Sequence, residues 1–496
     1  MSDNTKFGPP KGMRDWLPKE TLLRQKLIRL IEHHYQLYGF QPIDTPVMEN
    51  IEVFQGKGGG ENEKLMFKVL KRRDELKRSI DFVIDATTKA KQDKLLEGSG
   101  MENSKKIGDL REVKLSPVEA VKMEELMEGI ENNTSDMGLR FDLTVPLARY
   151  YANHANDLPK PFRCYHIGPV WRADRPQKGR YREFYQCDID IVGGASDSYE
   201  VELLLATDRV LKALGVGKFK IRISDKRLLP DLLTGMGVDA NQVAGVAVAI
   251  DKLDKQPPDQ VMKEIEALGH SMEVLNKVDG FIKNALHKQL DPVHFKIGQA
   301  EKIWLNIESI RQRIHAVNPD AQIVFDPLLV RGFDYYTGLV FEINVEDKDF
   351  SFSVGGGGRY DGLIEKLGGP KNTPAVGISL GFERIMLLLA EKEKSAAQVI
   401  YPRVFIANNG QSEKDILALA EQLRSEGIQV EACLEKKDFK KQMETAQANG
   451  IDCAITDFKP GAKSYKVRQL STRQDKEMPL AELYDIMKRL SEGVED

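Results

Sequence analysis

The sequence predicts a multidomain α+β protein whose domains are interrupted by two insertions. Its 496 residues suggest about three domains at roughly 150 residues each. Strand-like patterns occur on both sides of residues 226–320, and this segment itself is helix-rich. Beyond residue 400, short strand and helix patterns alternate, which is typical of an α/β domain with a mostly parallel sheet. We therefore expect a sheet-containing domain, a helical insertion and a separate C-terminal domain.

Composition narrows the class of protein. Hydrophobic residues make up 41% of the chain and charged residues 30%, which fits a soluble globular protein and not a disordered one. The net charge of −4 implies that a nucleic-acid partner would contact local basic patches and not the whole surface. We expect no membrane partner, because no apolar run approaches the roughly 18 residues that span a bilayer. The four cysteines form no Cys-x-x-Cys pair, so we expect no zinc ribbon or disulfide framework and a reduced, cytoplasmic setting.

The first predicted element is a helix over residues 20–38, which Gly39 ends. Its apolar positions are spaced to share one face: Leu23, Leu27, Leu30, Ile31, His34 and Leu37. Residues 40–49 alternate apolar and polar side chains and contain Pro42 and Pro46. Because proline cannot donate to a sheet ladder, this segment suits an edge strand or an interface.

Residues 71–135 differ in character from their surroundings. Lysine, arginine, aspartate and glutamate dominate there, and aromatic residues almost vanish. We predict a largely helical, surface-exposed insertion, and a solvated charged segment is favoured over a nucleic-acid contact.

The remaining elements are predicted from periodicity. Strands are expected within 139–145, 163–192, 323–345 and 352–354, and a helix within 380–392. In the C-terminal part, strands are expected at 404–407, 428–433 and 453–456, and helices at 413–424 and 439–449.

Residues 162–186 predict a basic β-hairpin, with two strand-like arms joined by a turn at 176–179. Its alternation directs Arg172, Phe184 and Gln186 toward a common face. Guanidinium groups bind phosphate in bidentate fashion, and an aromatic face can stack a base. The hairpin therefore indicates a nucleotide site, with a merely cationic surface hairpin as the alternative.

Two further segments combine arginine, tyrosine, aspartate and glycine: Arg331-Gly-Phe-Asp-Tyr-Tyr-Thr-Gly338 and Gly355-Gly-Gly-Gly-Arg-Tyr-Asp-Gly362. Arginine and tyrosine can hold an anion and a polar ring, and glycines let the backbone approach a ligand closely. This pair predicts a small-molecule site. Downstream, a glycine-punctuated strand turns into an apolar helix near Arg384. Taken alone, its Gly-Phe-Glu-Arg384 could be a surface ion pair.

Together these segments resemble the histidyl-tRNA synthetases, a family of class II aminoacyl-tRNA synthetases. Gly12-Met-Arg-Asp15 with the helix and strand ending around Pro46, the basic hairpin, and the Gly-Phe-Glu-Arg384 helix resemble class II motifs 1, 2 and 3 in order. Arg331-Gly-Phe-Asp-Tyr-Tyr336 and Gly357-Gly-Arg-Tyr-Asp361 resemble the two histidine-specific segments. The resemblance covers nearly the whole chain except residues 71–135.

The resemblance implies an antiparallel sheet flanked by helices, a helical insertion and a C-terminal α/β anticodon-binding domain. The implied ranges are 1–70, 136–225 and 321–395 for the catalytic domain, 71–135 and 226–320 for the insertions, and 400–496 for the anticodon-binding domain. It also implies a homodimer formed through motif 1. The implied reaction joins L-histidine, ATP and tRNA(His) through histidyl-adenylate, with Mg²⁺ accompanying the ATP phosphates.

Site roles follow from the positions that match the family's motifs. Arg172 is expected at the α-phosphate, with Arg331 opposite it as a second, charge-stabilising guanidinium. The expected ATP-binding residues are Arg172, Asp174, Phe184 (stacked on adenine) and Arg384 (at the γ-phosphate). The expected histidine-binding residues are Asp142, Thr144 and Gln186 at the ammonium end, and Asp190, Tyr335, Tyr336 and Tyr360 toward the imidazole. Gln177, Arg180 and Arg182 are expected to contact tRNA, and no residue is expected to form a metal site.

Two departures from the family pattern concern carboxylates. Asp142 stands where many bacterial members have glutamate and resembles the eukaryotic and archaeal form, and Asp174 stands where class II enzymes usually have glutamate. The main alternative is the non-catalytic paralogue that regulates ATP phosphoribosyltransferase. That paralogue lacks the anticodon-binding domain and has eroded arginines, whereas Arg172, Arg331 and Arg384 are all present here. A prolyl, threonyl or glycyl enzyme would leave the two histidine-specific segments unexplained.

Overall fold

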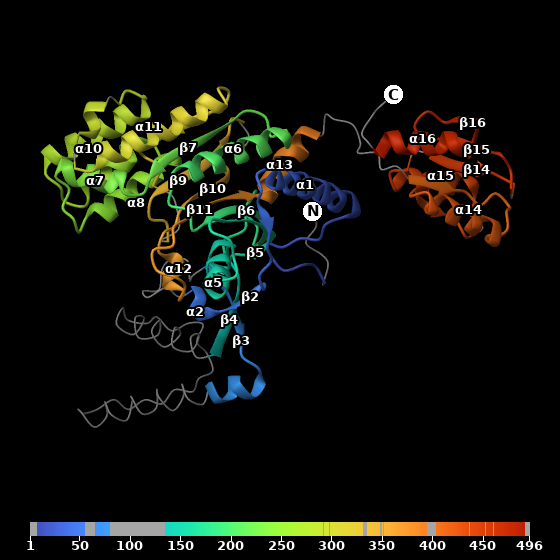
Figure 1. The fold of residues 1–496 in the computed structure, drawn as a ribbon, viewed down its shortest axis with the longest axis horizontal. Helices are drawn as coiled ribbons and strands as arrows, with labels where there is room; N and C mark the ends of the chain where they lie inside the picture. Colours follow the sequence, from blue (N-terminus) through green and yellow to red (C-terminus); the bar gives the residue numbers. More distant parts are fainter. Residues whose placement is uncertain are drawn as a thin grey trace, which may run out of the picture. The chain divides into compact units, whose positions relative to one another are not determined.

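The computed structural model describes residues 7–54, 65–79, 134–290, 292–296, 298–330, 335–347, 350, 352–393, 403–435, 437–451, 453–459 and 461–491. The chain divides into two compact units, Met1–Glu391 and Lys392–Asp496 (Figure 1). Among the described helices, none combines the length and the apolar character needed to cross a membrane.

An eight-stranded sheet is the frame of the first unit, with strand order β1-β5-β6-β11-β10-β9-β7-β8. Its strands are β1 (Gln41–Pro42), β5 (Phe162–Trp171), β6 (Glu183–Val192), β7 (Phe219–Asp225), β8 (Ile323–Phe325), β9 (Leu339–Val345), β10 (Ser353–Arg359) and β11 (Ala375–Gly381). The strands from β5 to β7 in this order pair antiparallel, whereas β1 and β8 join the two edges in parallel. The predicted antiparallel sheet is therefore confirmed.

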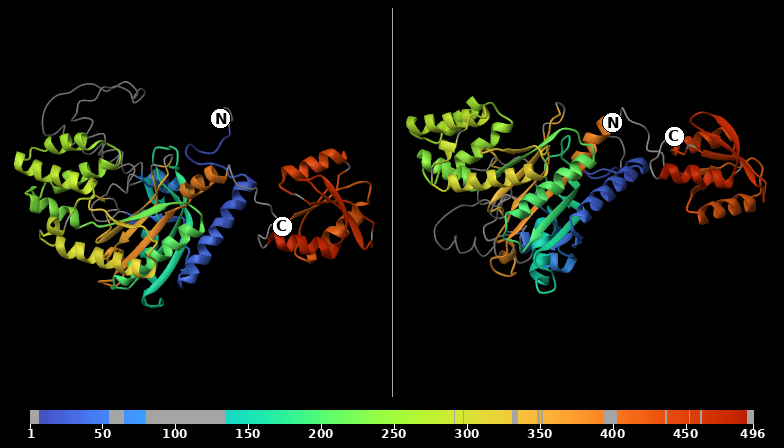
Figure 2. Two further views of the ribbon diagram at one scale, coloured as in Figure 1. Left: turned by 90° about the horizontal axis from the view of Figure 1, so that it is seen from above. Right: turned by 45° about the horizontal axis from the view of Figure 1, so that its top comes forward.

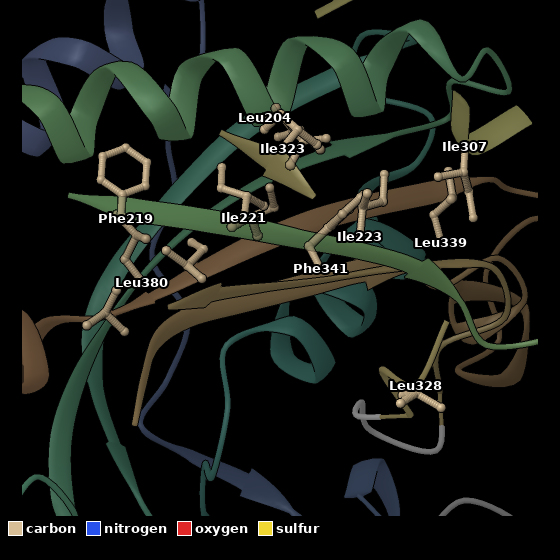
Figure 3. Close-up of a cluster of buried hydrophobic side chains, with 14 of the residues drawn as sticks. Leu204, Phe219, Ile221, Ile223, Ile307, Ile323, Leu328, Leu339, Phe341 and Leu380 are labelled. Carbon is tan, nitrogen blue, oxygen red and sulfur yellow. The ribbon is translucent and has the colours of Figure 1, made fainter. Parts of the chain in front are cut away.

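One face of this sheet is apolar. A single register row crosses it through Tyr165, Ile189, Ile378, Gly357, Phe341, Ile223 and Phe325. Three helices pack along this side: α1 (Pro18–Leu37), α6 (Ser198–Ala213) and α11 (Ala300–Val317). Figure 3 shows Leu204 of α6 and Ile307 of α11 beside Ile221, Ile223 and Phe341. Burial of these side chains supplies the main stabilisation of the unit.

The next register row is polar and lies on the opposite face, because successive side chains of a strand point to opposite sides. It contains His166, Asp188, Ser379, Gly356, Glu342 and Arg222. Part of this face is covered by α5 (Thr144–His154), α2 (Ile51–Phe54) and α12 (Leu363–Lys366), which pack on one another. One face of the sheet therefore packs against helices, and the other carries a row of polar side chains.

Three smaller parts complete the first unit. A three-stranded sheet has the order β2 (Met48–Asn50), β4 (Ser135–Leu139) and β3 (Phe67–Leu70). The helix α13 (Phe382–Glu393) follows β11 and lies beside α1 (Figure 1). The segment 226–320 is helical as predicted and gathers at the β7 end of the sheet (Figure 2). Its elements are α7 (Leu228–Met236), α8 (Val243–Asp251), η2 (Lys252–Asp254), α9 (Pro258–Glu266), α10 (Met272–Leu286), η3 (Pro292–Phe295) and α11.

The second unit is a five-stranded sheet with order β13-β12-β14-β15-β16 and helices packed against it. Its elements are β12 (Arg403–Ile406), α14 (Glu413–Ser425), β13 (Gln429–Ala432), α15 (Phe439–Ala448), β14 (Cys453–Asp457), β15 (Ser464–Gln469), β16 (Gln474–Pro479) and α16 (Leu480–Ser491). The prediction of a mostly parallel sheet is wrong. The pairs β12–β13 and β12–β14 are parallel, but the hairpin β15–β16 adds antiparallel pairs.

Several local predictions also need correction. Residues 139–145 are not a strand: β4 ends at Leu139 and α5 begins at Thr144. In α1 the buried side is Leu27, Ile31 and Tyr35, while Leu37 is 54% exposed. The edge position predicted for residues 40–49 is confirmed, since β1 and β2 each end a sheet. Of the charged insertion, only 71–79 and 134–135 are described, with 73–79 helical, and the rest lies outside the described residues.

Candidate active site

Asp142 occupies the loop that leads from β4 into α5, where Arg140 anchors the backbone. The Arg140 side chain is 1% exposed and donates to the backbone oxygens of Thr45 and Pro169. Asp142 Oδ1 then accepts from Val145 N at 3.2 Å, and Oδ2 accepts from Tyr335 Oη at 2.9 Å. Burial raises the pKa of Asp142 to about 6, and the Tyr335 hydrogen bond and Arg172 moderate this rise.

Asp190 lies on the polar face of β6 and forms a second carboxylate–phenol pair. Its Oδ1 accepts from Tyr360 Oη at 2.7 Å, and both side chains are buried. Burial raises the pKa of Asp190 to about 7; the Tyr360 hydrogen bond lowers it and the Asp142 charge raises it. Directly across the ladder stands Gly377, where a Cβ would lie 1.8 Å from Asp190 Oδ1. Only glycine leaves room for this carboxylate.

Three tyrosine rings form one wall of the site. The Tyr335 ring centroid lies 5.0 Å from that of Tyr336 and 6.2 Å from that of Tyr360, in edge-to-face geometry. Tyr336 packs over β10 beside Gly358, where a Cβ would come within 2.9 Å of its ring. Burial raises the pKa of each phenol, so all three are neutral donors at pH 7.

Gln186 and Asp188 continue the polar face along β6 toward the hairpin. Gln186 Nε2 donates to Ser379 Oγ on β11 at 2.6 Å. Burial, followed by the neighbouring Asp190 charge, raises the pKa of Asp188 well above its usual range. Asp188 was not among the predicted site residues, although its spacing of two from Gln186 and from Asp190 places it between them on one face.

The hairpin β5–β6 carries the predicted phosphate and base contacts. Arg172 donates from Nε to Phe141 O at 2.9 Å, and its guanidinium carbon lies 5.1 Å from the centre of the Phe184 ring. Arg172 therefore lies between the predicted adenine platform and the Asp142 carboxylate. At the tip, Gln177 and Arg180 pair through their backbones. Further predicted residues lie beside this tip: Asp174 Oδ1 is 3.7 Å from Arg180 Nη1, and Arg182 Nε donates to Asp174 O.

Arg384 in the first turn of α13 reaches the same hairpin. Its Nε donates to Gly179 O at 3.0 Å and its Nη1 to Ser353 O at 2.6 Å. The adjacent Glu383 instead forms an ion pair with Arg24 of α1 at 2.8 Å, and both side chains are nearly inaccessible to solvent. The alternative of a surface ion pair between Glu383 and Arg384 is therefore wrong.

The structure thus brings nine of the predicted residues together on one side of the sheet, while Asp174, Gln177, Arg180, Arg182 and Arg384 lie at or beside the hairpin tip. Asp142, Thr144, Gln186, Asp190, Tyr335, Tyr336 and Tyr360 surround the centre of β6, and Arg172 and Phe184 adjoin them. Arg331 lies outside the described residues. A cavity of about 880 Å³ adjoins Phe352 and the insertion helices, and its floor includes Arg222 and Glu342 of the same polar row.

This arrangement suits a small zwitterion with a polar ring. Buried carboxylates and phenols can bind a cationic group and ring nitrogens, and Arg172 can bind an anionic group at the end of the site. Phe184, stacked under Arg172, offers a flat surface to a base.

Comparison with known proteins agrees with this chemistry. The family model described as Histidyl-tRNA synthetase matches residues 115–385, and that described as Anticodon binding domain matches residues 403–490. A histidine--tRNA ligase of Leifsonia xyli is 35% identical over 453 residues, which cover 89% of this chain and 93% of that protein. The chain belongs to the histidyl-tRNA synthetase family. It is therefore an aminoacyl-tRNA ligase by family.

Other similar proteins and structures match this chain over most of its length. The histidine--tRNA ligase of Flavobacterium johnsoniae is 33% identical and aligns over 93% of this chain and 95% of its own length. The crystal structure of the histidyl-tRNA synthetase from Nostoc sp. PCC 7120 superposes with a TM-score of 0.70 at 25% identity, covering 98% of this chain and 99% of that one. A Bacillus halodurans structure described as an ATP phosphoribosyltransferase regulatory subunit/histidyl-tRNA synthetase shares the fold, with a TM-score of 0.62 at 18% identity.

Proposed function

We propose that the chain is a histidine–tRNA ligase that activates L-histidine with ATP and transfers it to tRNA(His). The observation that carries this proposal is the pair of buried carboxylate–phenol contacts, Asp142–Tyr335 and Asp190–Tyr360, beside Arg172. The first pair is proposed to face the α-ammonium of histidine and the second its imidazole. A site that satisfies the imidazole in this way rejects other side chains, because they would leave buried polar groups unpaired.

The first step is the attack of a histidine carboxylate oxygen on the α-phosphorus of ATP. A new oxygen–phosphorus bond forms as the bond to the β-phosphate oxygen breaks, and pyrophosphate leaves. Arg172 would bind the α-phosphate, Phe184 would stack on adenine and Arg384 would bind the γ-phosphate. Such groups act by positioning and charge stabilisation, so this step needs no general base. In the second step a ribose hydroxyl at the 3′ end of tRNA attacks the histidyl carbonyl and AMP leaves.

Two side chains would have to change partners when ATP binds. Arg384 is engaged by the backbone oxygens of Gly179 and Ser353, and Asp174 lies close to Arg180. Arg331 is proposed from the family resemblance as the second guanidinium at the α-phosphate. Magnesium is proposed as the companion of the ATP phosphates, because Mg²⁺ in ATP-using sites is bound largely by the substrate phosphates and water.

The domain assignment is also a proposal. We assign 1–70, 136–225 and 321–395 to catalysis, 226–320 to a helical insertion and 400–496 to anticodon binding. The family matches to 115–385 and 403–490 support this division. Gln177, Arg180 and Arg182 at the hairpin tip are proposed to contact the tRNA.

A homodimer formed through residues 40–50 is proposed as the assembly. The small sheet leaves Val47 and Met48 more than two-fifths exposed. A second copy could cover these side chains. Sedimentation equilibrium should give a dimer, and Met48→Glu should shift it toward the monomer; a wild-type monomer would contradict this part. The four cysteines are thiols and two of them are buried, which supports a cytoplasmic location.

One assay tests the function as a whole: amino-acid-dependent ATP–pyrophosphate exchange with each of the twenty amino acids. Histidine alone should support exchange, and exchange with proline or threonine but not histidine would contradict the assignment. In addition, Arg331→Ala should reduce adenylate formation by orders of magnitude while histidine still binds. Unchanged single-turnover activation in that variant would remove Arg331 from the proposed role.

A further inference from the structure

The polar face of β6 carries one more carboxylate than the proposed histidine contacts use. Gln186, Asp188 and Asp190 alternate along the strand and share this face, with steps of about 6.6–6.8 Å between them. Asp188 is 2% exposed and Gln186 is 6% exposed. Burying a carboxylate is unfavourable unless donors or a cation compensate both of its oxygens, so the hydrogen-bond partners of each Asp188 oxygen matter.

The other two carboxylates already accept hydrogen bonds from the protein. Asp142 accepts from Val145 N and Tyr335 Oη, and Asp190 accepts from Tyr360 Oη. Asp188 also has a side-chain hydrogen bond with Ser379. However, its Oδ1 and Gln186 Oε1 are buried and have no hydrogen-bond partner in the part of the chain that the structure describes. Asp188 Oδ1 and Gln186 Oε1 are therefore two acceptors on one face of β6 that a ligand could use.

The surroundings of Asp188 supply little positive charge. On one side, His166 lies directly opposite it on β5. Burial and the Arg140 guanidinium lower the pKa of His166 to about 4, so this imidazole is neutral at pH 7. On the other side, Ser379 of β11 forms a side-chain hydrogen bond with Asp188 that lowers its pKa, and the Arg172 charge lowers it less. A neutral hydroxyl and a weak contribution from Arg172 leave room for a cation supplied by a ligand to contact Asp188 Oδ1.

We propose that Asp188 and the Gln186 amide oxygen bind the α-ammonium of the amino-acid substrate. An ammonium carries three N–H donors, and these two acceptors occupy adjacent same-face positions of β6. An imidazole held by Asp190 and Tyr360 places the ammonium of the same molecule one strand step away, beside Asp188. Asp142, fixed by Tyr335 and Val145, then borders this position and does not bind the ammonium alone. This inference rests on the proposed function and deepens it.

The ammonium would also compensate the buried charge of Asp188. Burial and Asp190 favour the protonated form of Asp188 when no ligand is bound. A cation within hydrogen-bond distance favours the ionised form instead. Ligands that keep the ammonium should therefore depend on Asp188, and ligands that lack it should not.

The test compares three ligands on the wild-type enzyme and on Asp188→Asn. L-Histidine is measured by ATP–pyrophosphate exchange, and histidinol and imidazole-4-propionate are measured as inhibitors competing with histidine. Histidinol keeps the ammonium and lacks the carboxylate, whereas imidazole-4-propionate lacks the ammonium. We expect Asp188→Asn to raise the KM for histidine and the inhibition constant of histidinol on the order of 10- to 100-fold, because a charge-assisted hydrogen bond is lost. The inhibition constant of imidazole-4-propionate should change less than about twofold.

The matched control is Asp190→Asn, which should weaken all three ligands because all three contain imidazole. A second variant, Asp188→Ser, gives the same comparison if the asparagine disturbs folding, which thermal unfolding with and without ATP would reveal. The inference is overturned if histidine and imidazole-4-propionate weaken equally in Asp188→Asn, or if neither changes. Calorimetric binding of the same ligands gives this comparison independently of exchange. Absence of histidine-dependent exchange in the wild type would instead contradict the proposed function.

Discussion

Replacing Asp190 by asparagine should stabilise the first unit at pH 8 and disable histidine activation. Asp190 is 3% exposed, and burial raises its pKa from 3.8 to about 7. Asparagine has nearly the same shape, and its side-chain oxygen can still accept the hydrogen bond from Tyr360 Oη. The substitution therefore removes a buried charge and keeps the contact.

The magnitude follows from the pKa of Asp190. The difference between 3.8 and about 7 is about 3 units, and each unit corresponds to about 1.4 kcal/mol. Between these two values the folded chain retains a proton that the unfolded chain has released. Folding stability therefore falls as the pH rises from 4 to 7 and stays at the lower level above 7. Asparagine does not titrate, so its free energy of unfolding should exceed that of the wild type by up to about 4 kcal/mol at pH 8. At pH 4 the difference should nearly vanish.

Thermal unfolding at pH 4, 6 and 8 measures this difference, with histidine-dependent exchange recorded on the same samples. The matched variant is Tyr360→Phe, which removes the hydrogen bond that lowers the pKa of Asp190. It should destabilise the unit more at pH 8 than at pH 4. An equal Tm change for Asp190→Asn at pH 4 and pH 8, or a lower Tm at pH 8, would refute the reasoning.

Three other substitutions test separate parts of the site and its frame. Gly377→Ala should lower histidine-dependent exchange on the order of 100-fold, because its Cβ would displace the Asp190 carboxylate; an unchanged rate would show that the carboxylate can move. Phe184→Ala should raise the KM for ATP about tenfold and leave the KM for histidine unchanged, since stacking on a base is worth roughly 1–3 kcal/mol. Equal rises in the KM for ATP and the KM for histidine would remove Phe184 from the adenine contact. Glu383→Ala should lower the free energy of unfolding by about 3–5 kcal/mol in urea titrations, because it leaves the buried Arg24 without its counter-charge. The double variant with Arg24→Met should recover part of this loss. No loss in the single variant would contradict a structural role for the pair.

Much of the fold was predictable from local patterns, and the failures have physical causes. The hairpin arms and the helices of 226–320 are periodic over enough residues to be recognised. Residues 139–145 also alternate, yet the chain leaves the strand there because Arg140 turns inward to bond the Thr45 and Pro169 backbones. A contact with residues that distant is invisible to a local pattern. The predicted elements of the second unit do not include the hairpin at 464–479. The sheet is therefore expected to be mostly parallel, whereas this hairpin pairs antiparallel.

Part of the candidate site was likewise predictable from local patterns, and part was not. Alternation alone groups Gln186 with Asp190, and the same alternation places Asp188 between them, so its position was available from the sequence. That its Oδ1 has no hydrogen-bond partner among the described residues was not, because that depends on where Tyr335 and Tyr360 direct their hydroxyls. The requirement for glycine at 377 likewise becomes clear only when the opposite strand is known to carry Asp190.

The buried ion pair between α1 and α13 has a consequence for synthesis on the ribosome. Arg24 and Glu383 are 359 residues apart in the chain. At roughly 5–20 residues per second, Arg24 leaves the ribosome on the order of 20–70 seconds before its counter-charge is made. The contact of α1 with α13 therefore forms only at a late stage of synthesis, after Glu383 has been made. A chain that ends before residue 383 would lack the counter-charge that Arg24 has in the folded unit.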